Sequence, residues 1–292
     1  MKSLLLIVVA AAALSQGAPI AAQSLVPPPP AANRSPADSK TTPKNEVPKN
    51  GRNDEENARQ ARALLEQAIQ ALGGDAYLNI HDIEQEGRTY TFYHGRPTSN
   101  GILFWRYVEF PDRERIDLTK EKDISALYTA DKGYEITYKG AKEIEKKDLD
   151  DYLRRRRFSL ENILRVWIND PNVALFFEGT ALAGNLAAQQ ITLINVKDEA
   201  VHIFLDVDTH LPLKKSYSWR DPVDKERNIE EEIYDNYRAV QGVMTPYGFT
   251  RYFNGDMQTQ RFVNGAHYNQ DLNPAMFDPN SGYNPNKPAG KK

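Results

Sequence analysis

VHIFLDVD, residues 201–208, is the stretch of this 292-residue chain that points most directly to its fold. Apolar and polar residues alternate along most of it, which is typical of a β-strand with one buried face. Phe204 departs from the alternation, because it falls on the face that His202 and Asp206 share. The turn residues Asp208-Thr209-His210 follow at once, so we expect the strand to continue into a hairpin. The side chains that we expect on the buried face are Val201, Ile203, Leu205 and Val207.

The same period of two extends outward on both sides of this stretch. Twelve segments in all read as strands, and turns rich in glycine, proline and aspartate separate them. We expect five strands in the first half, at residues 83–93, 101–110, 113–119, 124–130 and 134–138. We expect seven more after the middle of the chain, at residues 176–182, 188–196, 201–206, 213–220, 229–240, 248–254 and 257–263.

Two regions have the spacing of helices instead. The first spans residues 54–72 and ends at Gly73-Gly74, and the second runs from about residue 147 to 169, where Asp170-Pro171 stops it. Parallel strands need helical crossovers, and one such helix cannot serve twelve strands, so the sheet should be mostly antiparallel. A sheet of about 11–12 strands has to curl. We therefore predict an α+β fold, a strongly curved antiparallel sheet covered by two or three helices.

The two ends of the chain differ from this central region. Residues 1–22 read as a signal peptide, with an apolar run from Leu4 to Leu14 and small residues before Gln23. Residues 23–53 form a proline-rich spacer and residues 279–292 a similar tail, and both are too poor in apolar residues to offset the entropy of ordering. Residues 54–278 remain as one domain. Because the chain has no cysteine, it cannot carry a lipid anchor at the cleavage point or a disulfide, so we expect an exported, soluble protein.

Composition and motif content argue against several classes of function. A net charge of −3 favours neither nucleic acid nor an anionic membrane surface, and no transmembrane segment is expected once the signal is removed. Nucleophile-elbow, zinc-protease, Walker and dinucleotide-binding patterns are missing from the sequence. The five histidines never occur at metal-ligand spacing, and Asp206 and Asp208 fit a hairpin turn better than half a calcium site. We therefore expect no enzyme: no catalytic residue, no metal and no cofactor.

Five short motifs together resemble a known family. They are Leu72-Gly73-Gly74, Phe110-Pro111-Asp112-Arg113-Glu114-Arg115, Asp208-Thr209-His210-Leu211-Pro212-Leu213-Lys214, Tyr234-Asp235-Asn236-Tyr237 and Asp271-Leu272-Asn273-Pro274-Ala275-Met276-Phe277-Asp278. The pattern covers most of residues 54–278 and resembles the periplasmic lipoprotein-carrier superfamily, the Lol carriers and the outer-membrane lipoprotein-sorting proteins. The resemblance implies a periplasmic location and a half-barrel closed by helices, with an apolar cavity that holds acyl chains.

One position departs from that family. The lipoprotein carriers have an arginine just before the proline that ends this strand, and that arginine holds the helical lid. Here the position is Phe110, with Arg113 and Arg115 nearby but not in register with it. The resemblance therefore extends to the fold rather than to lipoprotein delivery as such.

Strand alternation selects a set of candidate cavity residues. For Phe104, Tyr128, Tyr138 and Trp219, plain core packing is the favoured interpretation. The predicted ligand-binding residues are Phe104, Val108, Phe110, Tyr128, Ile136, Tyr138, Ile203, Leu205, Tyr217 and Trp219. The run Arg154, Arg155, Arg156 and Arg157 is the densest positive cluster. It is expected either to contact lipid headgroups or a protein partner, or to form a solvated helix face opposite Asp148, Asp150 and Asp151.

Three hypotheses about function follow. The first is a periplasmic, non-enzymatic binder or carrier of lipid or of an acylated lipoprotein, held in the cavity of the half-barrel. The second is a protein-interaction or stress-sensing module of the cell envelope on the same fold, which the proline-rich spacer and the arginine run motivate. The third, a hydrolase of an envelope polymer, has less support because nothing in the sequence pairs two carboxylates.

Overall fold

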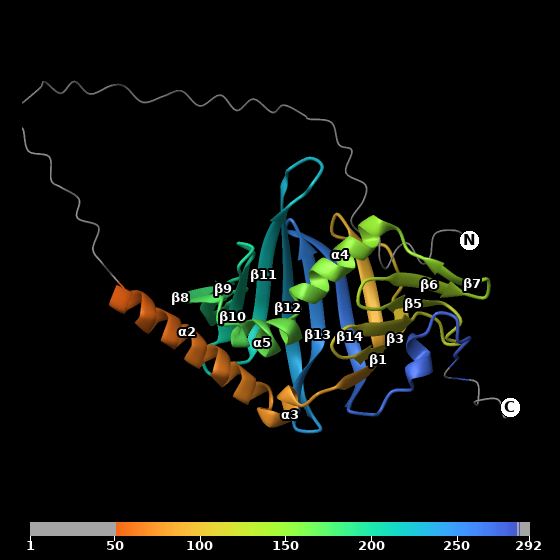
Figure 1. Ribbon diagram of the computed structural model, residues 1–292, viewed down its shortest axis with the longest axis horizontal. Helices are drawn as coiled ribbons and strands as arrows, with labels where there is room; N and C mark the ends of the chain where they lie inside the picture. Colours follow the sequence, from red (N-terminus) through yellow and green to blue (C-terminus); the bar gives the residue numbers. More distant parts are fainter. Residues whose placement is uncertain (1–50, 285, 287–292) are drawn as a thin grey trace, which may run out of the picture.

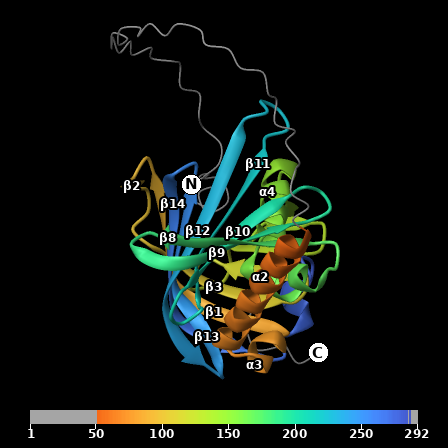
Figure 2. The same ribbon diagram turned by 90° about the vertical axis from the view of Figure 1, so that its left-hand side faces the viewer.

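The computed structural model describes residues 51–284 and 286, and these residues build one open sheet of 14 strands with helices on its concave side (Figures 1 and 2). Every strand pairs antiparallel with its neighbours, in the order β7-β6-β5-β4-β3-β1-β14-β13-β12-β11-β10-β9-β8, and β2 pairs with β1 beside this path. The strands are β1 (Asp82–Tyr93), β2 (Arg96–Pro97), β3 (Ile102–Glu109), β4 (Arg113–Asp117), β5 (Ser125–Tyr128), β6 (Gly133–Thr137), β7 (Gly140–Glu143), β8 (Ala174–Ala183), β9 (Leu186–Ile194), β10 (Ala200–Asp206), β11 (Pro212–Arg220), β12 (Arg227–Val240), β13 (Val243–Phe253) and β14 (Asp256–Tyr268).

The path of the chain explains why the helices cover one face. The chain starts in the middle of the sheet at β1 and runs outward to β7 at one edge. It re-enters at the opposite edge as β8 and returns strand by strand to β14, which pairs with β1. The crossing between the two edges consists of α4 (Lys146–Arg157), α5 (Leu160–Arg165) and the 3₁₀-helix η1 (Trp167–Asn169). The helices therefore pass over the concave face because the chain has to cross the whole sheet there (Figure 2).

The first of the two helices that precede the strands covers the edge of the sheet formed by β8. Helix α2 (Gly51–Leu72) lies against edge strand β8, and the short α3 (Asp75–Leu78) follows it. The Asn57 side chain donates from Nδ2 to the Phe177 carbonyl at 2.8 Å and accepts from the Phe177 amide at 2.8 Å. This amide side chain therefore pairs with β8 much as another strand would, which blunts an exposed sheet edge.

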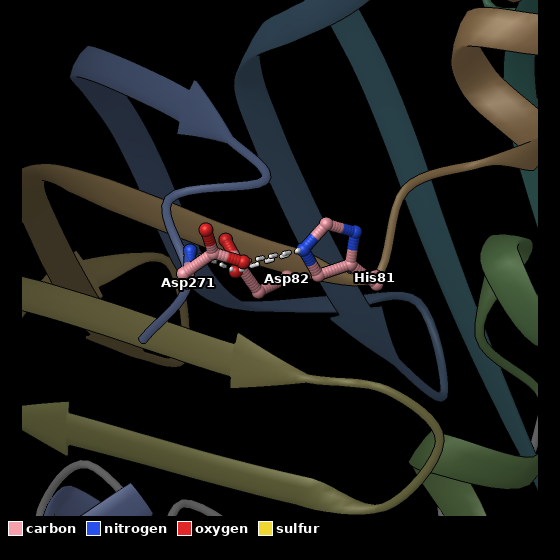
Figure 3. A group of neighbouring side chains, drawn as sticks. All are labelled: His81, Asp82 and Asp271. Atoms are coloured by element: carbon pink, nitrogen blue, oxygen red, sulfur yellow. Dashed lines mark hydrogen bonds and ion pairs between the residues drawn. The ribbon is translucent and has the colours of Figure 1, made fainter. Parts of the chain in front are cut away.

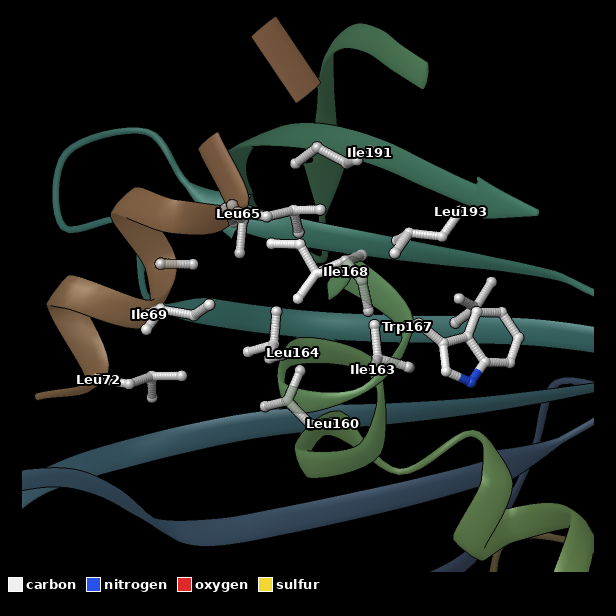
Figure 4. Close-up of a cluster of buried hydrophobic side chains, with 14 of the residues drawn as sticks. Leu65, Ile69, Leu72, Leu160, Ile163, Leu164, Trp167, Ile168, Ile191 and Leu193 are labelled. Carbon is white, nitrogen blue, oxygen red and sulfur yellow. The ribbon is translucent and has the colours of Figure 1, made fainter. Parts of the chain in front are cut away.

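The main core lies between α2, α5, η1 and the strands β8–β11 (Figure 4). Leucine and isoleucine side chains from the helices meet those of the sheet, and the Phe158 and Tyr217 rings stack at 4.1 Å. Helix α2 buries apolar residues at helical spacing, Ala61, Leu65, Ala68 and Leu72. At this end of the sheet, the concave face is filled by the helices.

A second cluster covers part of the convex face. The 3₁₀-helix η2 (Pro274–Phe277) packs Met276 and Phe277 against Tyr107 of β3 and Leu127 of β5. Beneath it the buried Arg115 donates to Asp117 at 2.8 Å, to Ser125 at 3.0 Å and to the Met276 carbonyl at 3.2 Å. The C-terminal segment is thus fixed to the sheet by both apolar packing and a buried charge.

The sheet bends where its pairing is irregular. A β-bulge interrupts the β1–β14 register between Glu86 and Gly87, in the middle of the sheet. A Cβ added to Gly87 would stand 2.0 Å from the Phe262 carbonyl oxygen and 3.0 Å from the Phe104 ring. Glycine is therefore required here by the close approach of two backbones, and bulges of this kind increase strand twist and bending.

Most of the predicted elements are present, with two differences. The class is confirmed as a large antiparallel sheet with few helices, but the count of strands was too low, because β2 and β7 are short and lack apolar alternation. The second helical region is divided at Phe158 and Ser159, where the Ser159 hydroxyl accepts from the Asn162 amide and starts α5. The described residues thus hold four α-helices rather than two or three.

The expected division of the chain remains a prediction. The signal peptide at residues 1–22 lies outside the described residues, as do all but the last three residues of the spacer at 23–53. Helix α2 begins at Gly51. Of the tail at 279–292, residues 279–284 and 286 are described: Tyr283 packs against the convex cluster, and Asn284 and Asn286 donate to carbonyls of residues 121 and 120.

Candidate ligand cavity

The concave face holds a cavity of about 730 Å³ between the sheet and helices α4 and α5. This volume lies within the ~300–1,000 Å³ typical of small-molecule sites. Strands β1, β3, β4, β5, β11, β12, β13 and β14 supply its floor. Its apolar wall includes Ile80, Ile83, Val108, Phe110, Ile116, Leu118, Leu153, Leu160, Val243 and Phe249.

Charged side chains share this wall with the apolar ones. Nine basic side chains line the cavity against four acidic ones, an excess of five positive charges in a chain whose net charge is −3. The basic residues are Arg106, Arg113, Arg155, Arg156, Arg157, Arg165, Lys215, Arg251 and Arg261, and the acidic residues are Asp112, Glu114, Glu161 and Glu232. The cavity is therefore apolar in part and cationic overall.

Two of these cations are neutralised by close partners on the floor. Arg106 Nε lies 2.6 Å from Glu114 Oε1, and the Tyr152 hydroxyl donates to Glu114 Oε2 at 2.7 Å. Burial raises the pKa of Glu114, but the Arg106 charge and these hydrogen bonds outweigh it, so the pKa lies below its ordinary value. Glu114 is consequently ionised at neutral pH and compensates Arg106.

The second neutralised pair lies on β11 and β12. Lys215 Nζ is 3.0 Å from Glu232 Oε2 and donates to the Phe158 carbonyl at 2.6 Å. The Tyr234 hydroxyl also donates to Glu232, at 2.8 Å. Burial opposes the ionised form of Glu232, but Lys215 and the hydrogen bonds prevail and lower its pKa to about 2.

Arg251 and Arg261 are far less well compensated. Arg251 reaches a carboxylate only at 3.9 Å, from Nη1 to Glu230 Oε1. Arg261 forms no hydrogen bond or ion pair with any residue that the structure describes, and its guanidinium carbon lies 5.1 Å from the centre of the Phe104 ring. Burial and the neighbouring Arg106 lower the pKa of Arg261 to about 10. These two cations therefore stand in the cavity with spare hydrogen-bonding capacity.

Helix α4 spans the cavity and is fixed by its own side chains. The Arg156 guanidinium donates to the carbonyls of Asp112, Thr129 and Ala130 at 2.8, 2.8 and 2.7 Å. The Tyr152 ring stacks on Tyr128 at 3.6 Å. These contacts connect α4 to β5 and to the loops after β3 and β5.

The predicted arginine run is thus directed largely inward. Arg154 lies 3.8 Å from the Trp219 ring and pairs with Asp151, and Arg157 pairs with Glu199 at 2.8 Å. Arg157 is exposed, so a partner contact there stays a prediction, and Arg155 lines the cavity without a hydrogen bond or ion pair to any described residue.

Phe110, at the position where the lipoprotein carriers have their lid arginine, contacts an arginine of helix α5. The Phe110 ring lies 4.5 Å from the Arg165 guanidinium of α5. Arg165 donates in turn to the carbonyls of Leu78 and Ile80 at 3.1 and 2.7 Å. A cation–aromatic contact therefore joins strand and helix here, with the cation on the helix.

The structure separates the predicted cavity residues into groups. Val108, Phe110 and Tyr128 line the cavity. Phe104 shares their face but packs with Tyr247 and Val263 in a separate cluster of buried side chains. The remaining residues lie elsewhere: Ile203, Leu205 and Tyr217 in the core under the helices, Trp219 under Arg154, Ile136 half-buried on the convex face, and Tyr138 84% exposed.

Sequence reasoning missed the charged floor. Arg106 did interrupt the apolar face of its strand, which was a readable signal of a polar interior. Arg251 alternates with Phe249 along its strand and was a similar signal, whereas Arg261 gave none, because the bulge in the β1–β14 pair changes which alternate residues of β14 face inward. Ile136 faces the convex side, where the C-terminal segment packs on β6, and Tyr138 lies in the exposed turn after β6.

One group outside the cavity has the composition of a metal site (Figure 3). His81, Asp82 and Asp271 each offer a ligand atom within 4.8 Å of the others. Both oxygens of the buried Asp82 already accept backbone amides, from Gln270 and Asp271 at 2.8 Å each. The group therefore fits an anchor for the chain after β14 without an ion.

No family model matches the chain, and no curated protein matches its sequence. Solved structures match its fold. One is a DUF1329 family protein from Desulfovibrio piger, with a TM-score of 0.52 and 14% identity over 75% of this chain and 97% of that one. Another is a putative outer membrane lipoprotein-sorting protein domain from Vibrio parahaemolyticus, with a TM-score of 0.50 and 11% identity over 76% and 97%.

These similarities confirm the predicted resemblance at the level of the fold, a curved antiparallel sheet with helices on its concave side. At such identities fold and function are separate questions. Among the described residues, no helix combines the length and the apolar character needed to cross a membrane.

Proposed function

We propose that this protein is an exported, periplasmic and non-catalytic binder or carrier of a ligand with an acyl chain, a lipid or an acylated peptide. The observation that carries the proposal is the cavity of about 730 Å³ on the concave face, with an apolar wall and a helical cover. The similarity in fold to a putative lipoprotein-sorting domain supports it. The Pro-rich spacer and the signal peptide predicted from the sequence are consistent with a carrier that acts outside the cytoplasm.

The energetics favour an acyl chain over a small polar molecule. Each methylene group removed from water contributes about 0.8 kcal/mol. Ile83, Val108 and Phe249 belong to or pack against the main core and also line the cavity, so they offer it apolar surface. A long chain could therefore supply most of the binding free energy without any base or nucleophile, in keeping with the lack of a catalytic motif.

The test combines native mass spectrometry with a variant that fills the cavity. Protein purified from the periplasm should carry extra mass that solvent extraction identifies as a lipid or acylated peptide. Ile116→Trp, at a half-buried wall residue, should remove that mass. Val223→Trp is the matched control, because Val223 is 88% exposed on a turn, and it should leave the bound mass unchanged.

Two results would refute the proposal. One is a clean protein mass that stays unchanged on incubation with phospholipid and with acylated peptide. The other is bound lipid that Ile116→Trp fails to displace. The first result, together with a stoichiometric protein partner in a pull-down, would favour the envelope protein-interaction module instead.

A further inference from the structure

We propose that the ligand of this cavity is an anionic amphiphile, and that Arg261, Arg251 and Arg155 bind its carboxylate or phosphate group. This inference rests on the proposed function, because it names the class of ligand for the same cavity. Three observations support it: the position of the three arginines, the unequal neutralisation of the charges on the floor, and the apolar wall beside them.

The three arginines approach the cavity from two sides. Arg251 on β13 pairs in register with Glu232 of β12, and Arg261 on β14 pairs with Phe249 of β13. Both side chains therefore stand on the concave floor, close to one another. Arg155 comes from α4, which covers the same cavity. An acidic group between floor and helix would thus meet guanidinium groups on both sides.

The balance of charge leaves these arginines available. Arg106 lies 2.6 Å from the carboxylate of Glu114, and Lys215 lies 3.0 Å from that of Glu232. Arg251, by contrast, reaches Glu230 only at 3.9 Å. Arg261 has neither a hydrogen bond nor an ion pair within the described part of the chain. A buried cation without a partner is costly, and arginine can donate to both oxygens of a carboxylate or phosphate.

The electrostatics of the arginines agree with this assignment. Burial, followed by the charge of Arg155, lowers the pKa of Arg251, and burial and Arg106 lower that of Arg261 to about 10. Arg251 and Arg261 are therefore each destabilised by a neighbouring cation, whereas for Arg155 burial is outweighed by the charge of Glu230, which raises the pKa. A bound anion would relieve that repulsion, since the floor holds too few carboxylates to do so.

The apolar wall indicates that the anion belongs to an amphiphile. Ile83, Val108 and Phe249 line the same cavity as the arginines, and Phe249 is the direct cross-strand neighbour of Arg261. A free inorganic anion would leave this wall uncovered, and an uncharged lipid would leave the arginines unpaired. A molecule with an acidic head and an acyl tail satisfies both parts.

The experiment measures binding of matched charged and uncharged probes to the full mature protein after delipidation. Oleate is compared with oleyl alcohol, and 1-oleoyl-lysophosphatidate with monoolein, by titration calorimetry. Inorganic phosphate is titrated alone. The same titrations are repeated with Arg261→Met and Arg251→Met, which keep most of the side-chain volume. Arg96→Met is the control, since Arg96 lies exposed on β2 outside the cavity.

We expect the charged probes to bind at least tenfold more tightly than their uncharged partners. Arg261→Met and Arg251→Met should each weaken the charged probes about ten- to a hundredfold, the loss of a charge-assisted hydrogen bond, and change the uncharged probes less than about twofold. Arg96→Met should change neither. Preference for oleate would identify a carboxylate head, and preference for lysophosphatidate a phosphate head.

Each other outcome overturns one specific statement. Equal binding of charged and uncharged probes, or equal losses for both in the arginine variants, would refute the anionic head while leaving an acyl binder intact. Tight binding of inorganic phosphate alone would refute the amphiphile. If no probe with an oleyl chain binds, the proposed function itself fails.

Discussion

Replacing Arg156 with methionine should loosen helix α4 and lower the free energy of unfolding by about 2–4 kcal/mol. The guanidinium makes three hydrogen bonds to carbonyl oxygens, at 2.7–2.8 Å, and hydrogen bonds from a charged group contribute about 1.5–3 kcal/mol each. The sum has to be reduced, because Arg156 is only half-buried and one of its acceptors is exposed. Two such bonds would contribute about 3–6 kcal/mol, and the discount for exposure lowers the expected loss to about 2–4 kcal/mol.

The neighbouring residue supplies the matched control. Arg155→Met removes the same side chain from the same helix, but Arg155 makes no hydrogen bond within the described residues and faces the cavity. It should change stability by less than about 1 kcal/mol, since its loss leaves no carbonyl unsatisfied. Arg156→Lys keeps the charge but cannot reach three acceptors, so an intermediate value is expected.

The assay is urea unfolding at pH 7 followed by circular dichroism, with the midpoint and slope compared across the three variants. Equal destabilisation by Arg155→Met and Arg156→Met would refute the reasoning, because then the helix, and not this set of bonds, determines the effect. A change below 1 kcal/mol for Arg156→Met would also refute it, since the contacts would then have no measurable role in holding α4.

Two further predictions concern the sheet and the acid limit of stability. Gly87→Ala should destabilise by more than about 2 kcal/mol in the same urea assay, because its Cβ would lie 2.0 Å from a carbonyl oxygen, whereas Gly265→Ala across the bulge meets only a flexible side chain at 3.4 Å and should cost much less. Glu232 ionises with a pKa lowered from 4.5 to about 2, so it contributes stability above pH 4.5 that is lost as the pH falls from 4.5 to 2, at most about 3 kcal/mol. The free energy of unfolding should therefore fall more steeply between pH 4.5 and 2 in the parent protein than in Glu232→Gln. Equal slopes would contradict the role of Glu232, and a loss well below about 2 kcal/mol for Gly87→Ala would contradict the role of Gly87.

Strand alternation predicted the fold well because it depends on burial, which is local to each segment. Residues 201–206 form β10 as expected, with Val201, Ile203 and Leu205 completely buried. The strands that were not predicted, β2 and β7, are too short and too polar to show an alternation of apolar and polar residues. The last strand was ended too early, because β14 continues through alternating small and polar residues to Tyr268.

The site was less predictable because alternation says that a face is buried without saying which face it is. Tyr134 and Ile136 alternate like cavity residues but contact the C-terminal segment on the convex side, where no strand or helix was predicted. The bulge next to Gly87 changes the inward set along β14 from Tyr268 and Ala266 to Val263 and Arg261. A cation such as Arg261 therefore reads as surface in the sequence and lies in the cavity in the structure.

The pairing of β1 with β14 has a consequence for how the protein is made. The strand that begins the sheet and the strand that completes it lie side by side at its centre, with Ile83 opposite Tyr268. A chain that stops before β14 would leave two half-sheets with open edges facing each other, and such edges invite aggregation. The central ladder can form only after nearly the whole domain is present, which makes folding slow and dependent on distant contacts. Completeness of the polypeptide is thus a condition for the cavity to exist at all.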